Sequence, residues 1–170
     1  KHIYTLAVKD TNIFAGTGNN GVFLSTNNGA SWTAANSGIA SFTIRSIAIS
    51  GTNIYAATSA NGVYLSTNNG TSWTPINTGI TNMYVGCIAV SGNNVYAGTD
   101  GGGVFFSNNN GSTWTALNTG LTDNFIYSLA VSGTNLYAGT SGKGVFRIAI
   151  NGTTWTPVNI GLENDFISSF

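Results

Sequence analysis

The stretch Ser66-Thr67-Asn68-Asn69-Gly70-Thr71-Ser72-Trp73 decides the fold, because close copies of it recur along the chain. Its tryptophan returns every 41 residues, and no insertion or deletion separates the copies. A fixed period of about 40–45 residues, in a sequence rich in strand-forming residues, is typical of propeller blades. We therefore expect one repeat domain over residues 1–170, with blades at approximately 2–42, 43–83, 84–124 and 125–166.

The second copy shows what one repeat contains. Alternating or β-branched segments at 44–49, 54–58, 63–66 and 72–77 predict four strands, and Gly- and Asn-rich turns separate them. The fold class is therefore all-β: a β-propeller built from four 41-residue, four-stranded antiparallel blades per chain. Pro75 and Pro157 fall at the same point of the fourth segment. Proline cannot donate to a ladder, so this strand is predicted at the outer edge and the first strand at the axis.

The recurring stretch resembles the Asp-box, Ser-x-Asp-x-Gly-x-Ser/Thr-Trp, of sialidase-like (BNR) propellers. The degenerate copies are most similar to those of bacterial surface proteins and photosystem-stability-factor-like propellers. Asn replaces the family Asp in three copies, and Ile148 and Ile150 replace the Ser and Asp of the fourth. The resemblance implies a structural turn rather than a catalytic one, and buried tryptophans. The residues that it assigns to this role are Asn27, Gly29, Trp32, Asn68, Gly70, Trp73, Asn109, Gly111, Trp114, Gly152 and Trp155.

Composition excludes several classes of function. Charged residues make up only 6% of the chain, with five Lys+Arg against five Asp+Glu, which is too little positive charge to hold a nucleic acid. No apolar run approaches the roughly 18 residues of a membrane span. The single histidine, His2, and the scattered acids predict no metal site and no cofactor. Cys87 shares its register with Thr5, Ser46 and Ser128, so we expect a small buried side chain rather than a reactive thiol.

Comparison of the copies separates constant from variable positions. The turns after the first and third strands barely change, whereas the loops after the second strand and between blades vary, and most of the charged residues lie on the face that these loops form. Variable loops on a rigid scaffold are typical of ligand surfaces, although sequence drift would give the same pattern. One first-strand position also varies, from Tyr through Arg and Gly to Tyr. The candidate ligand residues are Tyr4, Arg45, Tyr84, Asp100, Tyr127 and Lys143.

The sequence offers little for catalysis. The sialidase resemblance would require three arginines around a carboxylate, and the chain contains only Arg45 and Arg147. Asp100, Asp123, Glu163 and Asp165 are expected on one face, but nothing in their spacing selects the carboxylate pair of a glycosidase. We expect no enzyme activity, but a scaffold or interaction module of an extracellular or cell-surface protein, with a glycan or protein ligand. A carbohydrate-binding lectin with shallow sites between blades is the alternative, and a glycosidase fragment the third.

The end of the chain adds a further expectation. Residues 167–170 fall in register with 3–6 and read as the start of a fifth repeat. They could be a loose end, the trace of a longer array, or a segment that pairs with another subunit. Four blades in an open half-ring would leave an apolar face at each end, and large apolar patches usually mark interfaces. We expect self-association, either as an eight-bladed ring of two chains or as a head-to-tail assembly.

Overall fold

The computed structural model describes residues 2–169, which form sixteen strands and no helix. Blade 1 contains β1 (Ile3–Lys9), β2 (Asn12–Thr17), β3 (Val22–Ser25) and β4 (Thr33–Ala34). Blade 2 contains β5 (Ile44–Ser50), β6 (Asn53–Thr58), β7 (Val63–Ser66) and β8 (Thr74–Pro75). Blade 3 contains β9 (Val85–Ser91), β10 (Asn94–Thr99), β11 (Gly103–Ser107) and β12 (Thr115–Ala116). Blade 4 contains β13 (Ile126–Ser132), β14 (Asn135–Thr140), β15 (Val145–Ala149) and β16 (Thr156–Pro157).

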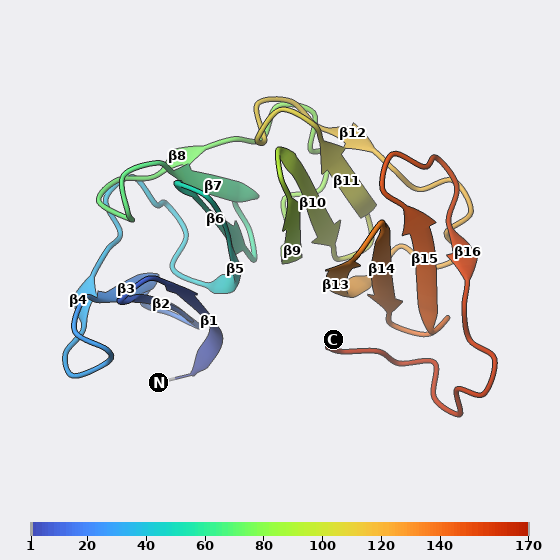
Figure 1. Ribbon diagram of the computed structural model, residues 1–170, viewed down its shortest axis with the longest axis horizontal. Coiled ribbons are helices and arrows are strands. Elements are labelled where there is room, and N and C mark those ends of the chain that lie inside the picture. Colours follow the sequence, from blue (N-terminus) through green and yellow to red (C-terminus); the bar gives the residue numbers. More distant parts are fainter. Residues whose placement is uncertain (1, 170) are drawn as a thin grey trace.

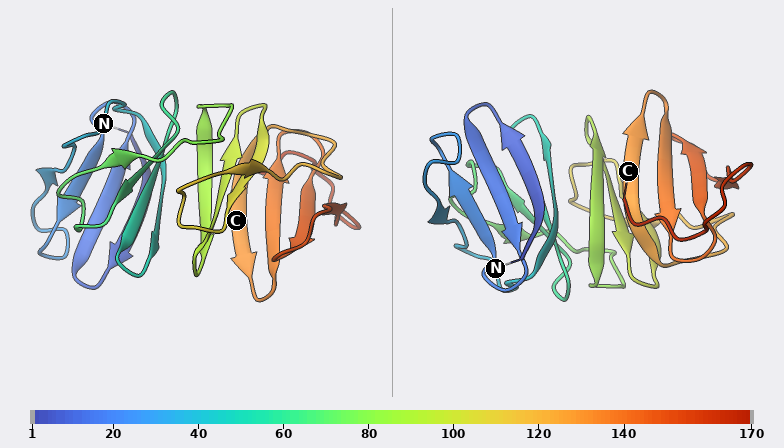
Figure 2. Two further views of the ribbon diagram at one scale, coloured as in Figure 1. Left: turned by 90° about the horizontal axis from the view of Figure 1, so that it is seen from above. Right: turned by 90° about the horizontal axis from the view of Figure 1, so that it is seen from below.

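Each blade is an antiparallel sheet whose strands pair in sequence order, so the predicted all-β fold of four four-stranded blades is confirmed. The blades form an arc with the first strands inside and the fourth strands outside (Figure 1). Consecutive first strands are neighbours, since β1 contacts β5, β5 contacts β9 and β9 contacts β13. The two termini lie at the open side of the arc. Figure 2 shows that the strands run along the axis around which the sheets are arranged.

Asn68 holds the turn between the third and fourth strands of blade 2. Its side-chain oxygen accepts hydrogen bonds from the Ser66 hydroxyl (2.9 Å) and the Ser72 backbone N–H (3.0 Å), and its amide donates to the Ser72 hydroxyl (2.8 Å). Ser66 is itself buried and accepts from the Gly70 N–H at 2.9 Å. Blades 1 and 3 repeat these bonds with Asn27 and Asn109. The turn therefore depends on a side chain that replaces missing backbone partners.

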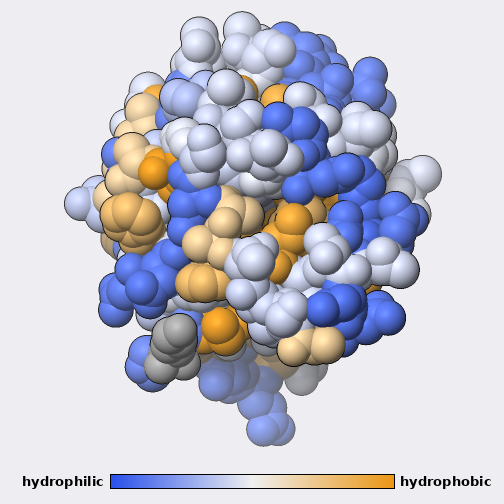
Figure 3. All heavy atoms as spheres, turned by 90° about the vertical axis from the view of Figure 1, so that its left-hand side faces the viewer, coloured by the Kyte–Doolittle hydropathy of each residue, from blue (hydrophilic) through white to orange (hydrophobic). Residues whose placement is uncertain are grey.

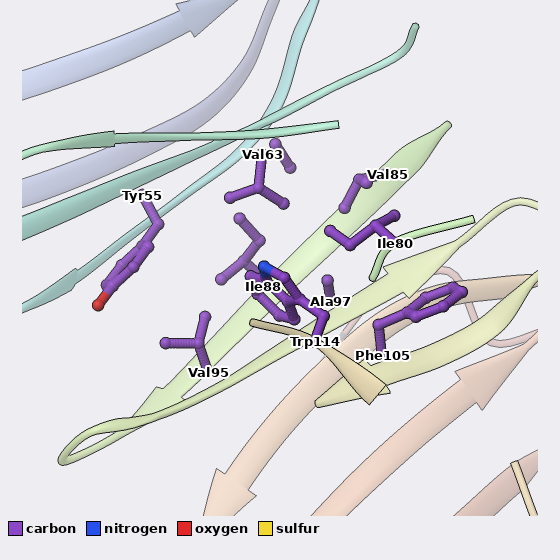
Figure 4. Close-up of a cluster of buried hydrophobic side chains, with 10 residues drawn as sticks. Tyr55, Val63, Ile80, Val85, Ile88, Val95, Ala97, Phe105 and Trp114 are labelled. Atoms are coloured by element: carbon purple, nitrogen blue, oxygen red, sulfur yellow. The ribbon is translucent and has the colours of Figure 1, made fainter. Parts of the chain in front are cut away.

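The hydrophobic core lies between blades rather than within them. Figure 4 shows the cluster between blades 2 and 3, where Tyr55 and Val63 of blade 2 meet Ile88, Phe105 and Trp114 of blade 3. Similar clusters join blades 1 and 2 and blades 3 and 4. Since a blade cannot cover its own faces, its stability comes from its neighbours.

The interpretation that gives all four tryptophans one buried role is wrong for Trp32. Trp73, Trp114 and Trp155 are 2–4% exposed, whereas Trp32 is 40% exposed. Each buried tryptophan packs on the blade before it, as shown by the hydrogen bond from Trp73 Nε1 to the Ala35 carbonyl (2.9 Å). In this structure no blade precedes blade 1, so the ring of Trp32 packs on no neighbouring blade.

We expect Trp73→Ala to lower the free energy of unfolding by about 3–5 kcal/mol, because it removes a large buried aromatic side chain. Trp32→Ala should cost about 1 kcal/mol or less, as for a residue at the surface. Chemical denaturation of both variants in dilute solution measures the difference. Equal losses would show that Trp32 is also buried in the folded chain.

Asn68→Asp should keep near-normal stability, because a carboxylate oxygen accepts the same two hydrogen bonds and the Ser72 hydroxyl can donate to the other oxygen. Asn68→Leu removes all three bonds and should lower the free energy of unfolding by about 1 kcal/mol. Thermal unfolding compares the two variants. Indistinguishable midpoints for Asp and Leu would contradict the role of this side chain in the turn.

Candidate ligand site at the inner mouth of the arc

An open pocket of about 340 Å³ lies at the inner side of the arc, at the end where the first strands begin. It draws on the first strands of all four blades and on the loops that follow β6 and β10. Its lining residues are Tyr4, Arg45, Ser59, Tyr84, Val85, Gly86, Asp100, Ile126, Tyr127 and Ser168.

One register position supplies half of this lining. Tyr4, Arg45, Gly86, Tyr127 and Ser168 stand 41 residues apart and all face the pocket. In β1, β5, β9 and β13 this position coincides with a break in the ladder register, as between Ile3 and Thr5 of β1. Such β-bulges leave one residue unpaired and redirect its side chain, and they are common beside functional sites. The bulge thus turns the Tyr4, Arg45 and Tyr127 side chains toward the pocket, whereas blade 3 carries Gly86 there.

Charged and aromatic groups meet in the pocket without being joined to each other by salt bridges. The Arg45 guanidinium lies over the Tyr4 ring, 4.9 Å from its centroid, a cation–π contact. Asp100 is held by its backbone, which donates to the Tyr84 carbonyl (3.0 Å) and accepts from the Asn82 amide (2.9 Å). Within residues 2–169, no hydrogen bond or ion pair engages the Asp100 carboxylate. The pocket therefore offers a cation, an anion and tyrosine rings to a ligand.

The structure brings together five of the six candidate ligand residues: Tyr4, Arg45, Tyr84, Asp100 and Tyr127. Lys143 lies outside the pocket, in the exposed turn after β14, where its backbone bonds Thr140 and Asn159. Sequence reasoning did not select Ser59 or Ser168, although both occupy register positions whose other members it had singled out. The repeat register was the signal that could have found them.

Asp123, another of the acids expected on this face, has a structural role in the hydrogen-bond network. Its two carboxylate oxygens accept from the Phe125 N–H (3.0 Å) and the Gly142 N–H (2.9 Å), so it ties the inter-blade loop to the turn after β14. Among the described residues, no group of three or more His, Cys, Asp or Glu side chains is placed to hold a metal ion.

Cys87 lies in β9 directly after Gly86 of the pocket, but it does not line the pocket. The expected burial of this residue is confirmed, and its sulfur contacts the Ile126 carbonyl oxygen at 3.8 Å. Loss of hydration in this site raises the pKa of the Cys87 thiol to about 12.

Radially arranged four-stranded sheets around a common axis define the β-propeller class. The chain belongs to the DUF6242 beta propeller domain family, whose model matches residues 2–125. Among curated proteins, no sequence matches this chain.

Solved structures share the fold at low sequence identity. The extracellular domain of a B. thetaiotaomicron protein, described as a one-component system, aligns with 99% of this chain at 19% identity and a TM-score of 0.81. An ancestral GH74 enzyme aligns with 93% at 22% identity and a TM-score of 0.74. YCF48 bound to D1 peptide aligns with 91% at 18% identity and a TM-score of 0.72.

The present chain spans only part of these proteins: 24% of the first two and 54% of YCF48. These neighbours include an extracellular domain, an enzyme and a peptide-bound protein, so the fold alone does not select a function. In the described part of the chain, no helix is long and apolar enough to cross a membrane.

The raised pKa predicts that Cys87 is unreactive in the folded chain. At pH 8 its thiolate fraction should be on the order of a thousandfold below that of an exposed cysteine, and its burial blocks access as well. Reaction with Ellman's reagent should therefore be slow for the native chain and fast after unfolding in guanidinium. Rapid labelling of the native chain would contradict the buried placement.

Proposed function

We propose that this chain is a non-catalytic interaction module of an extracellular or cell-surface protein. It binds a ligand in the pocket formed by Tyr4, Arg45, Tyr84, Asp100 and Tyr127, and it associates with other copies of itself. The observation that carries the ligand site is the bulge position. In blades 1, 2 and 4 it directs Tyr4, Arg45 and Tyr127 to the pocket, in blade 3 the position is Gly86, and the residue type therefore differs between blades, unlike the residues that hold the fold.

The state of the pocket side chains supports binding rather than a structural role. Among the described residues, no hydrogen bond engages the hydroxyls of Tyr4, Tyr84 and Tyr127, and Tyr84 is 59% exposed. Polar side chains that stabilise this fold, such as those of Asn68 and Asp123, instead make several hydrogen bonds within the chain. Aromatic and charged groups that line one hollow with their hydrogen-bonding atoms free of protein partners are typical of ligand sites.

The distribution of carboxylates supports the absence of catalysis. Glycoside hydrolysis requires two carboxyl groups on either side of one bond. Asp100 is the only acid among the pocket-lining residues, and the Asp123 carboxylate is engaged by two backbone N–H groups. A glycosidase fragment is therefore disfavoured, although the fold is shared with a GH74 enzyme.

A saccharide is the ligand class that we consider second, because tyrosine rings beside Arg and Asp can stack on a sugar ring and bond its hydroxyls. The site differs from the shallow inter-blade sites expected from the sequence. The cavity between blades 3 and 4, beside Tyr96 and Phe106, measures only about 10 Å³, which is about the space of one water molecule. We therefore propose the inner mouth of the arc as the place where a saccharide would bind.

Binding assays on the wild-type chain test the site, using a glycan array and a peptide array followed by calorimetry of the best ligand. We expect Arg45→Ala and Tyr84→Ala each to weaken binding about tenfold or more, as for central interface residues. Phe42→Ala is the matched control, since Phe42 is 55% exposed but does not line the pocket.

Binding that both pocket variants leave unchanged would refute the site. Glycan binding that both variants lose would favour the lectin over a peptide-binding module. Hydrolysis of aryl glycosides that Asp100→Asn abolishes would overturn the non-catalytic proposal.

A further inference from the structure

The three inter-blade interfaces use one set of contacts. Trp73 donates its backbone N–H to the Ser37 carbonyl (2.9 Å) and its indole N–H to the Ala35 carbonyl (2.9 Å). Trp114 and Trp155 repeat both bonds one and two periods later, at 2.6–2.9 Å. Gly38, Gly79 and Gly120 lie under the tryptophan backbone, where a β-carbon would collide with the tryptophan carbonyl oxygen.

The tryptophan side of this interface, which donates the hydrogen bonds, has no partner blade on blade 1. Trp32 is 40% exposed, against 2–4% for its three counterparts. Leu6 is 62% exposed, against 7% for Ile47 and Ile88 at the same register. Figure 3 views the molecule from the side where blade 1 lies and shows hydrophobic residues reaching the surface among polar ones.

The carbonyl side of the interface, which accepts the hydrogen bonds, has no partner blade on blade 4. Counting 41 residues onward from the contacts above leads to the carbonyls of Val158 and Ile160 and to Gly161. Gly161 has the same positive φ, 86°, as Gly38 (88°), but nothing lies within 4 Å of a β-carbon placed on it. Leu162 is 45% exposed, against 8% for Ile39 and 5% for Ile80.

We infer that the two open faces bind each other in two copies of this chain, a step that rests on the self-association proposed above. Trp32 of one copy docks on the Val158–Leu162 segment of the second copy. It donates its indole N–H to the Val158 carbonyl and its backbone N–H to the Ile160 carbonyl. Two such head-to-tail contacts close a ring of eight blades.

A second copy is favoured over an unlike partner because the open face of blade 1 and the open face of blade 4 are complementary. They carry the same two sets of groups that meet in each of the three interfaces between blades within the chain. The contact needs no charge, which suits a chain with 6% charged residues. One position departs from the apolar pattern: Arg147 stands where Leu24, Leu65 and Phe106 face the next blade. Asn28 of the second copy would lie close to this face, as Asn69 of blade 2 lies close to blade 1, where it accepts from Lys9 at 2.8 Å.

The segment after blade 4 already occupies part of the docking face. The Gly144 N–H donates to the Asp165 carbonyl (2.8 Å), as Gly21, Gly62 and Gly103 donate to the linkers that lead into blades 2, 3 and 4. Ile167 then packs against Gly139, as Ile44 packs against Gly16 and Ile126 against Gly98. This is the place that Ile3 of the second copy would take. The segment is therefore not a loose end but a competitor of the incoming β1.

Sedimentation velocity of the chain over a range of concentrations tests the assembly. We expect a species of twice 17.6 kDa that does not grow further, because a closed ring leaves no free face. Trp32→Ala and Leu162→Asp should each raise the dimer dissociation constant about tenfold or more. Circular dichroism checks that both variants fold, and Tyr84→Ala, which changes only the ligand pocket, should dimerise like wild type.

Mixing the two interface variants tests the head-to-tail arrangement. Each variant alone has one damaged face in every contact, whereas a mixed pair contains one contact with two intact faces. We expect the mixture to dimerise more strongly than either variant alone. Removal of residues 167–170 should strengthen wild-type dimerisation, because Ile3 then meets no competitor.

A monomer at all concentrations would overturn both the inference and the proposed self-association, and leave the ligand site untouched. Dimers that neither interface variant weakens would overturn the inference alone. Filaments would refute ring closure. Loss of ligand binding in Tyr84→Ala with normal dimerisation would show that the two proposals stand separately.

Discussion

The structure depends on the burial of each blade's face by the next blade. The contact from a tryptophan to the backbone of the preceding blade fixes the spacing, since it joins two backbone carbonyls, one glycine and one indole ring in every interface. Because all four components lie at fixed register, an inserted residue in any blade would separate them. This constraint explains why the sequence keeps a strict 41-residue period.

The same constraint frees other positions. The outer strands contribute two residues each. The loops at the inner mouth join neighbouring blades largely through backbone hydrogen bonds, such as that from the Gly21 N–H to the Phe42 carbonyl (2.8 Å), so many of their side chains are free to vary. The bulged residue of each first strand lies outside the regular ladder. It can therefore be Tyr, Arg or Gly without loss of strand pairing. A repeat scaffold thus separates residues that hold the fold from residues that can adapt to a ligand.

Sequence alone was sufficient for the blades, their strand order and five of the pocket residues, because each rests on local pattern or on register. It was insufficient for Trp32, whose sequence environment equals that of Trp73 but whose packing partner would be a blade before β1. The bulges also escaped prediction, because a one-residue ladder irregularity leaves no compositional signal when Tyr4, Arg45 and Gly86 share the position. Lys143 lies in the loop where the sequence places it but outside the pocket, because the direction of a loop, unlike register, is set by tertiary contacts.

The outer faces of the end blades are exposed, unlike the equivalent faces of the interior blades, although the repeat sequence changes little. Inside, an apolar residue at the Leu6 register is covered by a neighbouring blade; at the end, the same residue type meets solvent. A repeat chain can reduce this cost by polar substitution, and Arg147 is such a change on blade 4. Blade 1 shows no comparable change at Ile3, Leu6, Val8 or Trp32, all of which remain apolar and exposed. An unmodified repeat face is suited to cover by another repeat, and that is the physical reason to look for the partner of blade 1 among blades of this same sequence.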